Sequence, residues 1–354
     1  MFWCEFLLAG APVVCRSRDL NDRTLIIKVG ALGDVVLCTP QIERILELHG
    51  QHHGELHAGE VWLLTSPPFA PLFAGHPRLK VIAFPRQGAR AMWDSLRWVR
   101  AQRFTTVYDL QGSDRTRALT LLSGAGRRVG IAPRWIYTHS PVSDDIREHV
   151  FPRLNRLIES AGLPAAEPRP RLWPTSAEQQ AVAERLAAEG LRRRAFALLH
   201  AGSSARWPSK RWEAEHFVAL ARGIEAAGIT VLWIGGPDEA GLNRTLAAQV
   251  GRDMTGAFSI PGLSELARHT RFAVVNDSGP MHLLSAAGIP VYAFFGPTDW
   301  RRHHAVGQGE RVFTHPVECS PCYLGECPPA RRHACLAEIA PEEVLGRLRE
   351  DGIL

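Results

Sequence analysis

The chain of 354 residues is longer than one average domain, so two domains of about 150 residues each are expected. Its composition, 45% hydrophobic and 22% charged, is that of a globular protein with enough apolar side chains for two cores. The formal net charge of +5 is compatible with binding phosphates or an anionic membrane surface, but it does not indicate a nucleic acid partner. The sequence has no run of about 18 apolar residues, so no transmembrane helix is predicted.

Residues 1–22 resemble a signal peptide only superficially, because they lack a basic start and Glu5 interrupts a short apolar stretch. We interpret this segment as a poorly ordered extension, or as the product of a start codon placed too far upstream. Three of the seven cysteines, Cys4, Cys15 and Cys38, are scattered and the other four cluster near the C-terminus. This distribution fits a reducing compartment rather than a secreted disulfide scaffold.

Short apolar runs alternate with helix-length amphipathic segments in the first half of the chain. Strands are predicted at residues 24–29, 61–65, 80–84 and 105–110. Residues 39–50 predict a helix, with Thr39 as its N-cap, Pro40 at its first position and Gly50 beyond its end. Strands that alternate with helices indicate a parallel, doubly wound sheet.

A proline-rich break at residues 162–176 is typical of a linker between domains. The strand pattern then restarts, with predicted strands at residues 195–200, 230–235, 272–277 and 291–296. We therefore predict an α/β protein with an N-terminal domain over residues 23–165, a linker over 166–176 and a C-terminal domain over 177–354. The last helix could pack back on the N-terminal domain. Ligands of two such domains would bind in the cleft between them, at the carboxyl ends of the strands.

The first predicted strand leads into a turn with Gly30 and Gly33, followed by Asp34. The GxGxxG spacing of dinucleotide-binding turns is absent here. Asp34 could be a turn or helix-capping residue. Alternatively, its carboxylate is exposed in the cleft, where it could act as a general base.

The first strand of the second half is followed by Gly202, Ser203 and Ser204, and then by Lys210. Small residues leave backbone amides and hydroxyls facing outward, and with a lysine they favour an anion site. Lysine is rare in this chain, with three among 41 basic residues, so its position here is informative. The alternative is an exposed lysine on a solvated loop.

The next strand ends in the turn Gly235-Gly236, and Pro237 and Glu239 open the following helix. The helix dipole alone accounts for an acid in the first helical turn. A carboxylate at this place can also contact the ribose of a bound nucleotide.

The third such junction contains Asp277, Ser278, Gly279, Pro280 and His282. Ser278 is expected to cap a helix that Pro280 opens, so that free backbone amides would point at a bound phosphate. His282 would lie in the first turn, either as a functional group or as an ordinary packed histidine. Because three junctions converge on one face of the predicted sheet, each supports the functional interpretation of the others.

Taken together, these motifs resemble those of glycosyltransferase family 9, the heptosyltransferases of lipopolysaccharide core synthesis. The resemblance rests on residues 26–45, 200–212, 276–299 and 319–344, and more weakly on residues 107–119. It covers nearly the whole chain outside the N-terminal extension, with the motifs in the same order.

The resemblance implies a GT-B fold, in which two Rossmann-like domains face each other across a cleft. It implies an inverting, metal-independent enzyme that transfers heptose from ADP-heptose to Kdo or heptose on lipid A. The N-terminal domain would receive the acceptor and the C-terminal domain the ADP-sugar. The protein would be cytoplasmic and peripheral to the inner membrane.

The same resemblance assigns roles to individual residues. Asp34 matches the general base and Lys210 the lysine that binds the diphosphate. The expected donor-binding residues are Gly202, Ser203, Ser204, Glu239, Asp277, Ser278, Gly279 and His282, and those expected near the acceptor are Gly33, Asp109 and Gln111.

Cys319, Cys322, Cys327 and Cys335 have the spacing C-x2-C-x4-C-x7-C, with His333 beside the last of them. Four thiols this close together could hold a structural zinc or iron ion. The alternative is a set of buried thiols that pack a loop against the sheet, since the second C-x-x-C pair of a typical zinc site is missing. Neither interpretation gives them a catalytic role.

Two other functions remain open at this stage. The acceptor could be a protein, such as an autotransporter, instead of a lipid. The chain could also be a catalytically silent module that binds a nucleotide sugar, although Asp34 and Lys210 argue against this.

Overall fold

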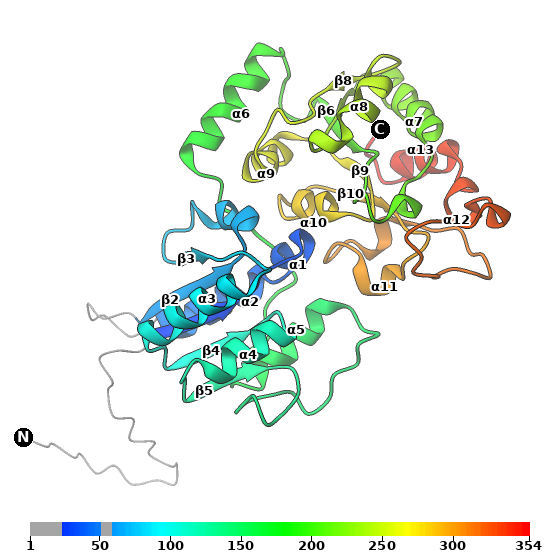
Figure 1. Cartoon of the computed structure of the whole chain (residues 1–354). Helices are drawn as coiled ribbons and strands as arrows, with labels where there is room; N and C mark the ends of the chain where they lie inside the picture. Colours follow the sequence, from blue (N-terminus) through cyan, green and yellow to red (C-terminus); the bar gives the residue numbers. More distant parts are fainter. Residues whose placement is uncertain (1–22, 51–58) are drawn as a thin grey trace, which may run out of the picture.

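The computed structural model describes residues 23–50 and 59–354, which form two α/β domains (Figure 1). The predicted extension over residues 1–22, with Cys4 and Cys15, lies outside the described residues. Throughout the part of the chain that is described, no helix has the length and apolar character needed to cross a bilayer.

The N-terminal domain has a parallel sheet with the strand order β3-β2-β1-β4-β5. Its strands are β1 (Arg23–Ile27), β2 (Glu60–Thr65), β3 (Lys80–Ala83), β4 (Thr106–Asp109) and β5 (Arg127–Gly130). Its helices are α1 (Leu32–Leu37), α2 (Thr39–Gly50), α3 (Ala89–Gln102), α4 (Asp114–Leu122) and α5 (Val150–Glu159), with a 3-10 helix η1 (Pro67–Phe73).

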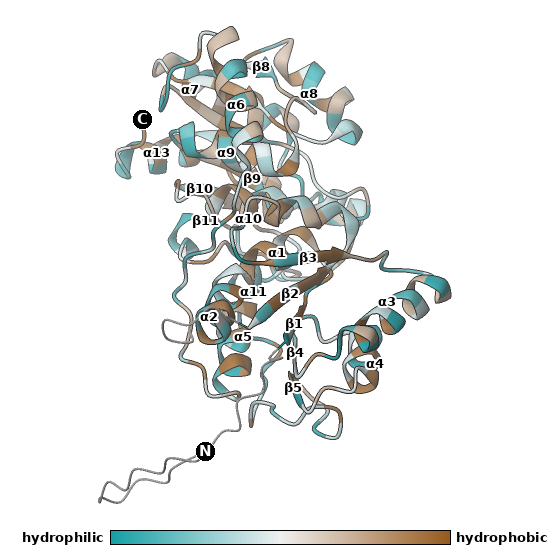
Figure 2. Ribbon diagram, turned by 90° about the vertical axis from the view of Figure 1, so that its left-hand side faces the viewer, coloured by the Kyte–Doolittle hydropathy of each residue, from teal (hydrophilic) through white to brown (hydrophobic). Residues whose placement is uncertain are grey.

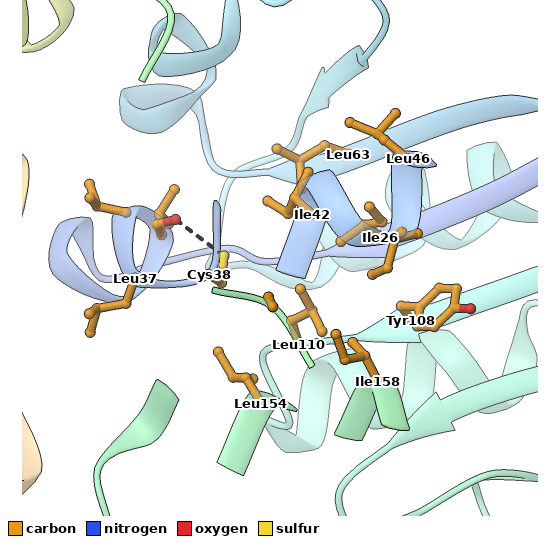
Figure 3. Close-up of a cluster of buried hydrophobic side chains, with 14 of the residues drawn as sticks. Ile26, Leu37, Cys38, Ile42, Leu46, Leu63, Tyr108, Leu110, Leu154 and Ile158 are labelled. Carbon is orange, nitrogen blue, oxygen red and sulfur yellow. Dashed lines mark hydrogen bonds between the residues drawn. The ribbon is translucent and has the colours of Figure 1, made fainter. Parts of the chain in front are cut away.

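Both faces of this sheet are covered, which explains why its strands are continuous apolar runs. Ile26 of the central strand β1 packs with Ile42 of α2 and Ile158 of α5 on one face (Figure 3). The neighbours Leu25 and Ile27 point to the other face, where they join a second cluster. All three strand residues are fully buried, so β1 is fixed on both sides and its carboxyl end is held rigidly.

The C-terminal domain has a second parallel sheet, with the order β11-β10-β9-β6-β7-β8. Its strands are β6 (Phe196–His200), β7 (Thr230–Trp233), β8 (Arg252–Asp253), β9 (Ala273–Asn276), β10 (Val291–Phe294) and β11 (Val312–Phe313). Its helices are α6 (Ser176–Ala188), α7 (Ala214–Ala226), α8 (Ala240–Ala247), α9 (Ile260–His269), α10 (Gly279–Ser285), α11 (Trp300–His303), α12 (Ala334–Ala337) and α13 (Pro341–Glu350). Four 3-10 turns lie between its strands and helices: η2 (Pro208–Lys210), η3 (Pro237–Glu239), η4 (Gly309–Arg311) and η5 (Pro329–Arg331).

Every predicted strand is present, and the predicted ends lie within two residues of the observed ones. The short strands β5, β8 and β11 were not predicted.

Thr39 is not an N-cap, because α2 follows α1 almost without a break and the Thr39 hydroxyl donates to the Val36 carbonyl at 2.9 Å. The expectation for the last helix is wrong as well. α13 packs against α7 of its own domain, where Val344 and Leu348 are buried in the C-terminal core.

The linker contacts both domains. The Arg171 amide donates to the Thr39 hydroxyl at 3.0 Å, and the Trp173 ring lies 4.5 Å from the His76 ring of the N-terminal domain. On the other side, the Arg268 guanidinium of α9 donates to the Leu172 carbonyl at 2.9 Å. The linker is therefore packed between the domains, not a free tether.

The two domains meet where α1 packs against α10, side by side in Figures 1 and 2. Gly33 of α1 lies directly against the His282 ring, since a Cβ at this position would be 2.4 Å from His282 Cδ2. Gly279 lies in the same way against Leu32. Leu283 of α10 is buried in the N-terminal core cluster, and the His149 ring bonds the His304 carbonyl at 2.9 Å. These contacts join the carboxyl ends of the two sheets.

We predict that Gly33→Ala destabilises the protein by about 1–3 kcal/mol, the usual cost of overpacking a filled site. The added methyl group has no room beside the His282 ring, and the melting temperature should therefore fall. Gly346→Ala is the matched control, because a Cβ at Gly346 in α13 would meet no atom within 4 Å. An unchanged melting temperature for Gly33→Ala would show that the helices α1 and α10 do not pack as described.

Burial at this domain contact lowers the pKa values of His282 and His149 to about 4. The unfolded chain therefore binds more protons than the folded one between pH ~6.5 and about 4, and stability is lost as the pH falls through this window. Chemical denaturation at pH 7.5 and 5.0 should show a smaller acid-induced loss for His282→Gln than for the wild type. His315→Gln, outside the contact, should behave as the wild type. If His282→Gln lost as much stability between pH 7.5 and 5.0 as the wild type, buried His282 would not be a source of the acid sensitivity.

Candidate active site

Asp34 lies at the third position of α1, directly after the turn that ends β1. Its carboxylate accepts the Ala31 amide at 3.3 Å and stays half-exposed at the domain contact. The turn itself is held by Gln111, whose side-chain oxygen accepts the amides of Val29 and Gly30, each at 3.2 Å. The side chain predicted to be near the acceptor thus fixes the loop that presents Asp34.

Asp109 is a buried structural carboxylate in this arrangement. It is 1% exposed and accepts the amides of Gln111 and Gly112 at 3.0 and 2.9 Å and the Tyr137 hydroxyl at 2.7 Å. Burial raises its pKa, and these hydrogen bonds oppose that effect. Asp109 therefore shapes the loop after β4, and the geometry supports an indirect role for it, through Gln111.

Lys210 ends the turn η2 and pairs with Asp277 at the end of β9, with 2.7 Å between Nζ and Oδ2. The Thr298 hydroxyl donates to the same carboxylate oxygen at 2.5 Å. The Lys210 side chain is 18% exposed and lies over the Trp207 ring, 5.1 Å from its centroid. An ammonium group has three N–H donors, so Lys210 can bind an anionic ligand while it keeps its contact with Asp277.

A second cluster of polar side chains, formed by His200, Glu239 and Ser278, connects the ends of β6, β7 and β9. The His200 ring lies between Glu239, at 3.1 Å from Nε2 to Oε1, and the Ser278 hydroxyl, at 3.3 Å from Nδ1. Glu239 also accepts the Gly236 amide at 2.8 Å. Burial alone would raise the pKa of Glu239, but the His200 ring, the Gly236 amide and Arg211 outweigh it and hold the pKa below its usual range.

Gly202 is required at this place by close packing, because a Cβ there would lie 1.5 Å from Glu239 Oε1. The two serines that follow differ. Ser203 is buried, donates to the Trp207 carbonyl at 2.8 Å and accepts from Arg211, so its hydroxyl is turned into the loop. Ser204 is exposed. The Ser203 hydroxyl therefore helps to hold the loop, and a contact of Ser203 with the donor stays a prediction.

Pro280 opens α10 as predicted, but Ser278 is not a side-chain cap. Its hydroxyl instead donates to the Asn276 carbonyl at 3.1 Å. His282 is buried against Gly33, and its Nδ1 atom has no hydrogen-bond partner among the described residues. Asp277 and Asp34 both lie near enough to raise its pKa, although burial outweighs them. His282 therefore marks the place where the acids of the two domains approach each other.

Three residues of this region were not predicted from the sequence. His200 is the first residue of the 200–212 motif, but only the fold shows that it lies between Glu239 and Ser278. His303 of α11 lies near Asp277, Lys210 and Asp34, and burial is the main cause of its lowered pKa. Asn276 is fully buried and binds backbone groups of Trp212, Ala201 and Gly202. The motifs at 200–212 and 276–299 begin with His200 and Asn276, but no local pattern predicts the contacts of these residues or the position of His303.

Cys319, Cys322, Cys327 and Cys335 are free thiols that line one small cavity together with Ser209 and His333. Over residues 23–50 and 59–354, no three His, Cys, Asp or Glu side chains are gathered into a group that could hold a metal ion. A structural metal ion at the cysteines stays a prediction.

Comparison with known proteins gives a consistent family. The family model described as glycosyltransferase family 9 (heptosyltransferase) matches residues 92–331. The chain is 24% identical over 328 residues to lipopolysaccharide heptosyltransferase 1 of Pseudomonas aeruginosa, covering 86% of this chain and 87% of that protein. It is also 24% identical over 149 residues, 40% of this chain, to lipooligosaccharide heptosyltransferase 2 of Campylobacter jejuni. In that second comparison the chain spans about half, 47%, of the relative's length.

Two solved structures show the fold. The glycosyl transferase family 9 structure from Veillonella parvula matches with a TM-score of 0.77 and 19% identity, covering 94% of this chain and 98% of that one. The E. coli heptosyltransferase WaaC with ADP matches with a TM-score of 0.71 and 19% identity, covering 93% of this chain and 99% of that one. The two parallel-sheet domains are thus the Rossmann-like domains of a GT-B fold. Because the family model covers more than half of the sequence, the chain belongs to glycosyltransferase family 9, the heptosyltransferase family.

Proposed function

We propose that the protein is an inverting glycosyltransferase that moves L-glycero-D-manno-heptose from ADP-heptose to Kdo or heptose of the lipopolysaccharide inner core. The family and the names of the relatives support heptosyl transfer. The observation that carries the proposal is a pair of groups from opposite domains. Asp34 of the N-terminal domain and Asp277, which pairs with Lys210 in the C-terminal domain, both lie near the buried His282 at the contact between α1 and α10.

The C-terminal domain would bind the donor. Negative charge grows on the ADP diphosphate as it leaves, and in this proposal Lys210 and the amides at the start of α10 stabilise it without a catalytic metal ion. Asp277 and Thr298 orient the Lys210 ammonium for this contact. In the same proposal Glu239, which binds the His200 ring, would accept hydrogen bonds from the ribose hydroxyls.

The N-terminal domain would bind the acceptor beside Asp34. The acceptor hydroxyl oxygen forms a bond to the anomeric carbon on the side opposite the diphosphate. The bond from that carbon to the diphosphate breaks, and ADP departs with the electron pair. The Asp34 carboxylate takes the hydroxyl proton, a step worth about 10²- to 10⁴-fold in rate. Attack from the opposite side inverts the anomeric configuration.

We also propose that the protein works in the cytoplasm at the surface of the inner membrane, where such an acceptor lies. The N-terminal domain has exposed apolar side chains, among them Trp93 on α3 and Trp135, Val142 and Ile146 in the segment between β5 and α5. Arg90 on α3 is almost fully exposed and could contact lipid phosphates. Aromatic and cationic side chains together favour a membrane interface.

We predict that Lys210→Ala raises the Kd for ADP about 10- to 100-fold, as expected for the loss of a charge-assisted hydrogen bond of about 1.5–3 kcal/mol. The unpaired Asp277 carboxylate, only 7% exposed, would also repel the diphosphate. Isothermal titration calorimetry with ADP measures the effect. Lys80→Ala is the matched control, because Lys80 is 48% exposed and pairs with Glu60 in the other domain. A Kd within twofold of wild type for Lys210→Ala would remove Lys210 from the donor site.

We predict that Asp34→Asn lowers kcat about 10²- to 10⁴-fold, because the amide cannot accept the acceptor proton. The Kd for ADP should stay unchanged, since the variant keeps the shape of the side chain and lies outside the donor-binding domain. Asp114→Asn, a fully exposed acid in α4, serves as the control for kcat. Full turnover by Asp34→Asn would refute its role as the base.

A further inference from the structure

The turn that carries Lys210 is held by a segment more than a hundred residues away. We call residues 319–335 the cysteine loop. The Ser209 amide donates to the Gly325 carbonyl at 3.0 Å, and the Ser209 hydroxyl donates to the Leu324 carbonyl at 2.6 Å. His333 Nε2 donates to the Ser209 carbonyl at 2.6 Å. Every polar atom of Ser209, the residue before Lys210, is therefore bound to the cysteine loop.

The same loop is fixed to the turn after β10. The Ser320 hydroxyl donates to the Gly296 carbonyl at 2.6 Å, and the Tyr323 amide donates to the Pro297 carbonyl at 2.7 Å. The next residue, Thr298, donates to the Asp277 oxygen that pairs with Lys210. The cysteine loop thus reaches both sides of the Lys210–Asp277 pair.

Close packing makes this support stiff. A Cβ at Gly325 would lie 2.6 Å from the Arg206 carbonyl oxygen, so the two backbones touch at this place. The four thiols, Ser209 and His333 enclose a cavity of only about 10 Å³. Ser209 is 5% exposed and Cys335 is 7% exposed, so breaking a bond of Ser209 would leave a buried polar group short of a partner.

We propose that the cysteine loop positions the Lys210 ammonium for the donor diphosphate, and that His333 is a positioning residue acting through the Ser209 carbonyl. The inference rests on the proposed donor site and adds a residue to it that does not touch the ligand. Loss of the His333 bond would free the η2 turn to move and would raise the entropic cost of placing Lys210 on the diphosphate.

The test is calorimetric ADP binding by the full chain. His333→Ala should raise the Kd for ADP about 3- to 10-fold, as expected from a net hydrogen-bond contribution of about 0.5–1.5 kcal/mol. His333→Gln keeps a terminal N–H donor, so its Kd for ADP should stay within about twofold of the wild-type value, a smaller change than the loss of one hydrogen bond would cause. His315→Ala is the control for loss of a histidine elsewhere in the domain. Ser209→Ala removes only the bond to Leu324 and should shift the Kd in the same direction, which keeps the proposal testable if His333→Ala does not fold.

A double-mutant cycle with Lys210→Ala separates positioning from general destabilisation. If His333 acts through Lys210, His333→Ala should have no further effect on ADP binding in the Lys210→Ala background. Two outcomes would overturn this inference and leave the proposed donor site standing. In one, His333→Ala raises the Kd for ADP equally in the wild-type and Lys210→Ala backgrounds. In the other, His333→Ala leaves the Kd unchanged although Lys210→Ala clearly raises it. A Lys210→Ala variant that binds ADP like the wild type would overturn the proposed donor site, and this inference with it.

Discussion

The packing of α1 against α10 is the contact on which the whole candidate site depends. At this contact Gly33 lies against the His282 ring and Gly279 against Leu32, with no room for a Cβ at either glycine. Asp34 follows Gly33 in the chain and Asp277 lies two residues before Gly279. The backbone approach of these two glycines therefore sets how far the acid of one domain stands from the lysine pair of the other.

Within the C-terminal domain, buried polar groups hold the strand ends in register. Asn276 accepts the Trp212 amide and donates to the carbonyls of Ala201 and Gly202, which ties the end of β9 to the loop after β6. His200 and Glu239 extend this connection to the end of β7. Leaving a buried polar group without a hydrogen bond costs free energy, so one of these loops cannot move without the others unless such bonds break. The Lys210 turn is thus held by these buried hydrogen bonds and by the hydrogen bonds from the cysteine loop to Ser209.

Much of the fold could be predicted from local sequence. Apolar runs predicted the central strands, and the turns that follow them pointed to Asp34, Lys210 and Asp277 as candidate site residues. Both predictions depend only on residues that are neighbours in the sequence. The strand β5 was not predicted because Arg127 and Arg128 interrupt its apolar pattern. The Arg127 guanidinium binds the carbonyl of Ala161, 34 positions away, and that of Arg128 binds the nearer carbonyls of Ile136 and Ala125.

The same limit applies to the site. The sequence does not show that the Ser203 hydroxyl binds the Trp207 carbonyl and Arg211, and its expected contact with the donor stays a prediction. Asp109 is likewise held inward by Tyr137, 28 positions along the chain. The His333 bond to Ser209 joins residues 124 positions apart, so no motif could reveal it. The partners of Asp109 and Ser209, 28 and 124 positions away, are fixed by the tertiary fold, whereas turns, strands and the contacts of Ser203 are local.

The most direct test of the account is ADP release from ADP-heptose, measured with a panel of truncated lipopolysaccharide acceptors and followed by the anomeric configuration of the product. We expect release that requires a lipid A–Kdo acceptor, and a product whose anomeric centre is inverted relative to the donor. Absence of acceptor-dependent release with every lipid A–Kdo acceptor, or a product with retained configuration, would contradict it.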